Sequence, residues 1–155
     1  MKLGEVLMKE RERKKLSKED VASKLGISLE EYDQIEAGES EAEKWFPLLC
    51  LTAVKLSVPT SRLLAESGKS KDCNPGQAGP LIKGHRERRQ MTADQMAEQL
   101  EVSREEYEQV EAGQSGIEKW GPLFLHFAEI VELPVFNFYL PFGLPYNQLR
   151  IEDYH

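Results

Sequence analysis

The sequence predicts an all-α fold built from two copies of one small helical domain. Shifting the chain by 75 residues aligns it with itself without a gap, so that segment 27–40, ISLEEYDQIEAGES, meets segment 102–115, VSREEYEQVEAGQS. Apolar residues in both copies recur at helical spacing between capping residues and glycines. A repeat of this length indicates a duplicated structural module. We therefore expect domains at residues 1–66 and 80–142, a linker at 67–79 and a C-terminal tail at 143–155.

The first three helices of each copy follow from apolar spacing and capping residues. Leu3, Val6 and Leu7 mark the apolar face of the first helix. Ser17 and Ser28 each stand where an N-cap is expected, with an acidic residue three positions later. That spacing is typical of a capping box, so it predicts the start of the second and third helices.

Glycine and proline predict where the remaining elements begin and end. Gly26 supplies a left-handed turn residue between the second and third helices, and Gly38 ends the third. In the second copy Glu101 replaces this turn glycine. Pro47 suits the first turn of a fourth helix, and Pro59 opens a short fifth one.

The segment between the copies, residues 66–80, reads ESGKSKDCNPGQAGP. It is rich in Gly, Ser, Pro and Asn and poor in apolar residues, a composition typical of a linker. The composition permits many relative placements of the two copies.

Each copy resembles the Cro/cI-type (XRE) helix-turn-helix family. The resemblance rests on LSKEDVASKLGISLEEYDQIEAG, from Leu16 to Gly38, and on its repeat from Met91 to Gly113. It implies an all-α fold of two lambda-repressor-like five-helix helix-turn-helix domains in tandem. The implied activity is that of a DNA-binding transcriptional regulator.

The resemblance also implies which residues would contact double-stranded DNA. In this family the third helix enters the major groove, while neighbouring helix ends and the following loop hold phosphates. Glutamine can pair with adenine, and glutamate can accept a hydrogen bond from cytosine. Carried over by position, the candidate DNA-binding residues are Lys18, Leu29, Glu30, Gln34, Lys44, Arg104, Glu105, Gln109 and Lys119.

The charge of these surfaces departs from the family pattern. The usual phosphate-binding glutamine at the start of the second helix is replaced by Lys18 and by Ala93, and the loop 39–43, ESEAE, is acidic. The net charge is -7, and most of it falls in the second copy. Negative charge opposes binding to the phosphate backbone. An alternative function therefore stays open, in which the chain is an acidic helix-turn-helix scaffold that binds a protein and not DNA.

A buried ion pair is implied in each copy by the same resemblance. Arg11 and Arg86 stand at the family position that pairs with the glutamate before the glycine. We therefore predict the pairs Arg11–Glu36 and Arg86–Glu111. The basic ends of the first helices, residues 9–15 and 83–90, are otherwise a second candidate nucleic-acid patch.

The second copy differs from the first by an aromatic segment. Residues 135–146, VFNFYLPFGLPY, stand where the first copy has plainer residues. Such a segment is typical of a core or a covering tail. Its alternative role is an exposed patch for a protein partner or for self-association.

Other functions find little support in the sequence. His85, His126 and His155 lack neighbours at metal-ligand spacing, so we expect no metal, no cofactor and no enzyme activity. The two cysteines suggest no disulfide framework. No apolar run is long enough to cross a membrane, and the charged N-terminal residues do not resemble a signal peptide. A cytoplasmic location is the expectation.

Overall fold

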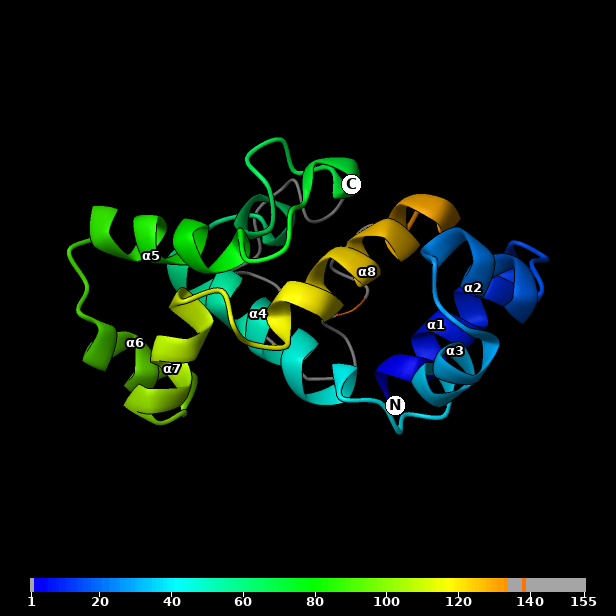
Figure 1. Ribbon diagram of the computed structural model, residues 1–155, viewed down its shortest axis with the longest axis horizontal. Helices are drawn as coiled ribbons and strands as arrows, with labels where there is room; N and C mark the ends of the chain where they lie inside the picture. The colour runs from blue at the N-terminus through cyan, green and yellow to red at the C-terminus, as the bar shows by residue number, and fades with distance from the viewer. Residues whose placement is uncertain (1, 134–137, 139–155) are drawn as a thin grey trace.

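The structure is a computed structural model that describes residues 2–133 and residue 138. This part of the chain is helical and contains no strand, as Figure 1 shows. Its elements in chain order are α1 (Leu3–Arg13), α2 (Lys18–Leu25), α3 (Leu29–Glu36), α4 (Ala42–Leu56), η1 (Thr60–Leu63), η2 (Ser70–Asp72), α5 (Ala78–Arg88), α6 (Ala93–Leu100), α7 (Arg104–Glu111) and α8 (Ile117–Val131).

The predicted capping residues begin α2 and α3. The Ser17 hydroxyl accepts a hydrogen bond from the Asp20 amide at 3.0 Å, and the Asp20 carboxylate accepts one from the Ser17 amide at 3.3 Å. The Ser28 hydroxyl accepts from the Glu31 amide at 3.1 Å. These bonds satisfy amide groups that the first turn of a helix leaves free. The same caps recur at the starts of α6 and α7.

The turn between α2 and α3 has the same backbone conformation in both copies, although the residue differs. Gly26 has φ +72°, and Glu101 at the matching position has φ +58°. Only glycine adopts this left-handed region without a steric cost. The second copy therefore carries a modest strain that the first avoids.

The fourth helix begins earlier than the sequence predicted. Pro47 was expected in its first turn, but α4 begins at Ala42 and Pro47 lies inside the helix. The first turn of α4 caps the start of α1. In the first turn of α4, the Glu43 carboxylate accepts hydrogen bonds from the amides of Leu3 (3.3 Å) and Gly4 (3.2 Å) at the start of α1. Glu118 does the same for the first amides of α5.

The two copies exchange their long helices. Apart from its first turn, α4 leaves its own copy and packs on α6 of the second, while α8 packs on α2 of the first. At the far end of α8, the Val131 carbonyl accepts a hydrogen bond from Arg13 at 3.2 Å, and Glu132 pairs with Lys14 at 3.2 Å. Figure 1 shows α8 ending beside α2 and α4 running toward α5.

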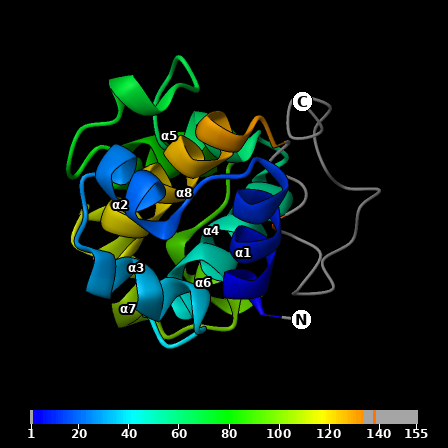
Figure 2. The same cartoon turned by 90° about the vertical axis from the view of Figure 1, so that its right-hand side faces the viewer.

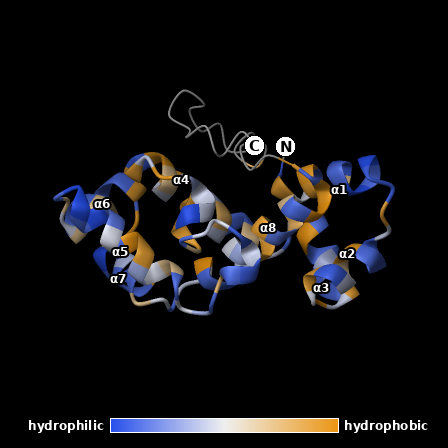
Figure 3. Cartoon of the chain, turned by 90° about the horizontal axis from the view of Figure 1, so that it is seen from above, coloured by the Kyte–Doolittle hydropathy of each residue, from blue (hydrophilic) through white to orange (hydrophobic). Residues whose placement is uncertain are grey.

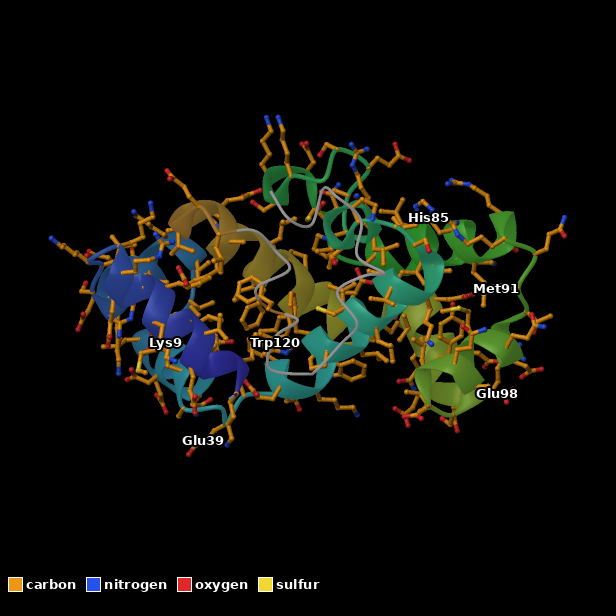
Figure 4. All side chains as sticks on the ribbon, turned by 180° about the vertical axis from the view of Figure 1, so that it is seen from behind. Lys9, Glu39, His85, Met91, Glu98 and Trp120 are labelled. Atoms are coloured by element: carbon orange, nitrogen blue, oxygen red, sulfur yellow. The ribbon has the colours of Figure 1, made fainter. Side chains whose placement is uncertain are left out.

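The exchanged helices cross at the centre of the molecule. The rings of Phe46 in α4 and Phe124 in α8 lie 4.9 Å apart. Trp45 lies directly over Gly116, and Figure 4 shows Trp120 in this central region. Apolar residues follow both long helices, as the colouring in Figure 3 shows, and the buried apolar residues form a single cluster.

Because of this exchange, neither copy encloses its core within its own stretch of sequence. The all-α class is confirmed, but the prediction of two tandem domains is not. The boundaries at residues 66 and 80 stay predictions about the sequence repeat. The physical reason is that each α4-type helix has apolar residues on a face that either copy of the three-helix unit can cover.

The segment expected as a linker is packed against both copies. It contains the short helix η2, where the Ser70 amide donates to the Glu129 carboxylate of α8 at 3.0 Å. Gly76 packs so closely on Gly113 that a side chain at Gly113 would clash with it. These contacts restrict the placements that the composition alone permits. The fifth helix of the first copy is the short 3-10 helix η1.

Part of the second copy lies outside the described residues. This applies to the tail 143–155 and, except for Phe138, to the proposed partner segment 135–146. The Phe138 ring is buried against Phe46, Phe124 and Phe127.

Candidate nucleic-acid interface

The second and third helices of each copy pack against each other, and their inner residues hold the third helix in place. Val21 and Ala22 of α2 are buried against the core, as are Tyr32 and Ile35 of α3. The helix α1 comes so close to α3 that a methyl group on Gly4 would meet the Ile35 carbonyl. The outer face of α3 is therefore fixed in direction by packing on its inner face.

The predicted ion pair of each copy anchors this unit. The Arg11 guanidinium donates to both Glu36 carboxylate oxygens, at 2.7 and 3.2 Å, and to the Leu16 carbonyl at 2.9 Å. The two side chains are only 10% and 5% exposed. The hydrogen bond from Arg11 to Glu36 raises the Arg11 pKa, and burial opposes it only in part. The pair joins the end of α1 to the end of α3, and this prediction is confirmed.

The second copy repeats the pair with the same geometry. Arg86 donates to the Glu111 carboxylate at 2.6 and 3.1 Å and to the Met91 carbonyl at 2.7 Å. Burial acts to raise the Glu111 pKa, but the hydrogen bonds and the positive charge of Arg86 outweigh it, so the pKa is lowered. Both third helices are thus held by a charged clamp at their C-terminal ends.

The third helices of the two copies lie on one face of the molecule. α3 and α7 lie toward opposite ends of the long axis in Figure 1, and Figure 2 shows them on the same side when the molecule is turned. The exchanged helices α4 and α8 fill the space between them. The predicted DNA-contacting residues therefore form two surfaces, one at each end of this face.

The outer side chains of the two third helices are exposed, as the sequence predicted. On α3 they include Leu29, Glu30 and Gln34. On α7 the matching residues Arg104, Glu105 and Gln109 are exposed as well. Both Gln and Glu positions are the same in the two copies, whereas the first residue of the helix differs.

The cations of the first surface contact acids or aromatic rings. The Lys18 ammonium lies 3.1 Å from the Asp33 carboxylate on α3. Lys44 lies over the ring of Trp45, with its nitrogen 4.6 Å from the ring centre. An ammonium over a ring face is attracted by the ring's negative charge density. Both contacts reduce the positive charge that this end presents to solvent.

The cations of the second surface are paired in the same manner. Arg104 donates to Asp94 at 2.6 Å and lies 3.0 Å from Glu108. Lys119 comes from the second copy, but it lies 2.6 Å from Glu31 on α3 and therefore beside the first surface; it also lies over the ring of Trp120. Residue-by-residue transfer from the family pattern identified these cations but missed their acidic partners. Glu108 could have been found by helical spacing, since it lies four residues after Arg104 on α7. Asp94 lies on the neighbouring helix α6, so spacing within one helix does not reveal it.

The basic ends of α1 and α5 make different contacts, so they do not form one shared nucleic-acid patch. Arg13 and Lys14 of α1 hold the end of α8, as described above. On α5, labelled by His85 in Figure 4, the Arg89 guanidinium donates to the His85 carbonyl at 2.7 Å. Burial and the charges of Arg88 and Arg89 lower the His85 pKa. The first of these segments thus serves the contact between the copies.

Residues 7–43 match the helix-turn-helix family model, which is the Cro/cI (XRE) type. The first copy carries a helix-turn-helix of this family. The match runs from α1 to the first turn of α4 and includes the turn at Gly26 and the outer face of α3. A helix-turn-helix of this type suggests a DNA-binding regulator and is typically not an enzyme. No curated protein and no solved structure matched the chain.

Among the described residues, no group of His, Cys, Asp and Glu could hold a metal ion. No helix in that part of the chain is long and apolar enough to span a membrane. The cytoplasmic location stays a prediction.

Proposed function

We propose that the chain is a transcriptional regulator whose two helix-turn-helix units bind one DNA duplex together. The family match of residues 7–43 supports DNA binding by the first unit. The single observation that carries the paired arrangement is that α3 and α7 lie on one face, at its two ends. Regulators of this kind usually present two such helices to successive turns of the major groove as a symmetric dimer.

The exchange of α4 and α8 supplies the frame that this function needs. Two helix-turn-helix units on a loose linker would sample many spacings, each with an entropic cost on binding. Here the central helices pack on both units, and the linker itself is packed. The spacing of the recognition helices is therefore fixed before DNA binds. One chain thus supplies the two helix-turn-helix units that a dimer supplies in other regulators.

The charge of the face predicts how strongly DNA should bind. Lys18, Arg104 and Lys119 each contact an acid, so few cations are available to displace counterions from the duplex. The salt dependence of binding scales with the number of phosphates neutralised. We expect weak non-specific affinity, a shallow salt dependence and a large share of affinity from base contacts.

A gel-shift selection from random duplexes at low salt tests the proposal. The expected result is enrichment of one sequence family, with loss of binding in the double variant Gln34→Ala/Gln109→Ala. The matched control is Gln99→Ala, an exposed glutamine at the end of α6. No enrichment at the lowest salt would reject the DNA-binding function.

A second function is favoured by the same acidic contacts. If the face binds a basic protein, exposed acids such as Glu30 and Glu105 would carry the affinity. Binding of an arginine-rich peptide that weakens in Glu30→Gln/Glu105→Gln would support it. Under the DNA-binding function, the same variant should gain non-specific DNA affinity because two negative charges leave the groove-facing surface.

A further inference from the structure

The two recognition helices present the same side chains at most outer positions but differ at the first. Glu30 and Gln34 on α3 match Glu105 and Gln109 on α7. The first residue is Leu29 on α3 and Arg104 on α7. This residue lies at the N-terminal tip of the helix, the part that comes closest to base edges in helix-turn-helix proteins.

Leu29 stands out from the other apolar side chains. It is 39% exposed, and within the described part of the chain it is the large apolar residue that remains exposed. Leaving a leucine in water forgoes the free energy of burying it. An apolar side chain at this position can instead contact the methyl group of thymine, which projects into the major groove.

Arg104 occupies the matching place with different chemistry. Asp94 at the start of α6 accepts from Nη1 at 2.6 Å, and Glu108 lies 3.0 Å from Nε. The Nη2 group takes part in neither contact. Both acids are more than half exposed, so water or DNA can replace these contacts at little cost. Once these contacts are exchanged, the Arg104 guanidinium can donate two hydrogen bonds to O6 and N7 of guanine.

The helix before each recognition helix, α2 or α6, also differs in its first residue, but here the first unit has the cation and the second does not. The first residue of α2 is Lys18, whereas the first residue of α6 is Ala93. The first unit therefore has its cation beside the tip of the recognition helix and an apolar residue at the tip. The second unit has its cation at the tip and none at the neighbouring position. The two surfaces therefore have the same helix arrangement but present different side chains to the bases.

We propose, building on the DNA-binding function above, that the two half-sites of the operator are not identical. The half-site under α3 has a thymine whose methyl group contacts Leu29. The half-site under α7 has a guanine at the corresponding position, bound by Arg104. The shared glutamate and glutamine read the same inner bases in both halves. The chain consequently binds its operator in one orientation, unlike a symmetric dimer.

Base analogues in the selected duplex test each contact separately. Replacing the thymine by deoxyuridine removes only its methyl group, and should weaken wild-type binding several-fold while leaving Leu29→Ala unaffected. Replacing the guanine by 7-deazaguanine removes only the N7 acceptor. It should weaken wild-type binding about tenfold and leave Arg104→Leu unaffected, since good two-pronged pairs discriminate by about that factor or more.

A reciprocal variant tests the asymmetry as a whole. Leu29→Arg/Arg104→Leu should select the same duplex as the wild type but lie on it in the opposite orientation, which a DNA-cleaving reagent attached to one unit would report. Leu29→Arg alone should select a palindrome with guanine in both halves. Circular dichroism would check that both variants fold, as expected for exposed positions. Selection of palindromes by the wild type, or indifference to both analogues, would overturn the asymmetry and leave the DNA-binding function standing. Absence of any DNA binding would overturn both.

Discussion

The ring of Phe46 lies 4.9 Å from the ring of Phe124, a residue of the other sequence repeat. These two side chains mark the point where α4 and α8 cross, and both are buried. The crossing makes one core out of two repeats. The stability of α3 and of α7 therefore depends on residues of both copies.

Phe124→Ala should destabilise the whole chain and not only the second copy. Removing a buried phenylalanine costs about 3–5 kcal/mol through lost burial and the cavity left behind. Unfolding in urea, followed by tryptophan fluorescence and by circular dichroism, should show one shared transition that moves to lower urea. Two separate transitions, with only one displaced by the substitution, would contradict the shared core.

Arg11→Met should cost about 3–5 kcal/mol of folding free energy, because it leaves the Glu36 carboxylate buried without its partner. The matched control is Arg104→Met, which breaks an exposed ion pair and should change thermal stability little. Thermal unfolding of both variants measures the contrast. Equal, small effects would mean that Arg11 does not clamp α1 to α3.

The lowered pKa of Glu111 predicts how stability responds to acid. A carboxylate with a lower pKa in the folded state stabilises the fold above its unfolded pKa of about 4.3, and this contribution is lost as the pH falls through the folded value. Glu111→Gln removes it. The variant should be less stable at pH 7, and the difference from the wild type should shrink as the pH drops below about 4. A constant difference across this range would argue against the assignment.

Glu101→Gly should stabilise the chain by about 0.5–1 kcal/mol. Its left-handed conformation costs energy for any residue with a Cβ atom, and the first copy already uses Gly26 there. The mirror substitution, Gly26→Ala, should lower the melting temperature, although no atom lies near the added methyl group. If both variants changed stability in the same direction, backbone strain at this position would not explain the difference between the two copies.

Local features of the fold could be predicted from the sequence because they depend on residues close together or on fixed family positions. The caps at Ser17 and Ser28, the turn at Gly26 and the clamp between Arg11 and Glu36 are of this kind. Each needs only a local backbone shape or one contact within a copy.

The exchange of α4 and α8 could not be predicted in this way. Apolar periodicity shows which face of a helix is buried but not which partner covers it. Two copies of nearly the same unit offer nearly the same binding surface, so the pattern fits both the closed and the exchanged arrangement. Asp33 and Asp94 were missed as partners of Lys18 and Arg104 for a related reason, because each comes from a neighbouring helix.

The most direct test of the paired recognition face is a hydroxyl-radical footprint of one chain on the selected duplex, with stoichiometry measured in the same sample. If the two units bind together, one chain occupies each duplex and protects two patches whose centres lie about 10 base pairs apart, one turn of the double helix. Leu29→Arg and Arg104→Leu should each alter only one patch. A single protected patch, or two chains required to produce both, would contradict the account.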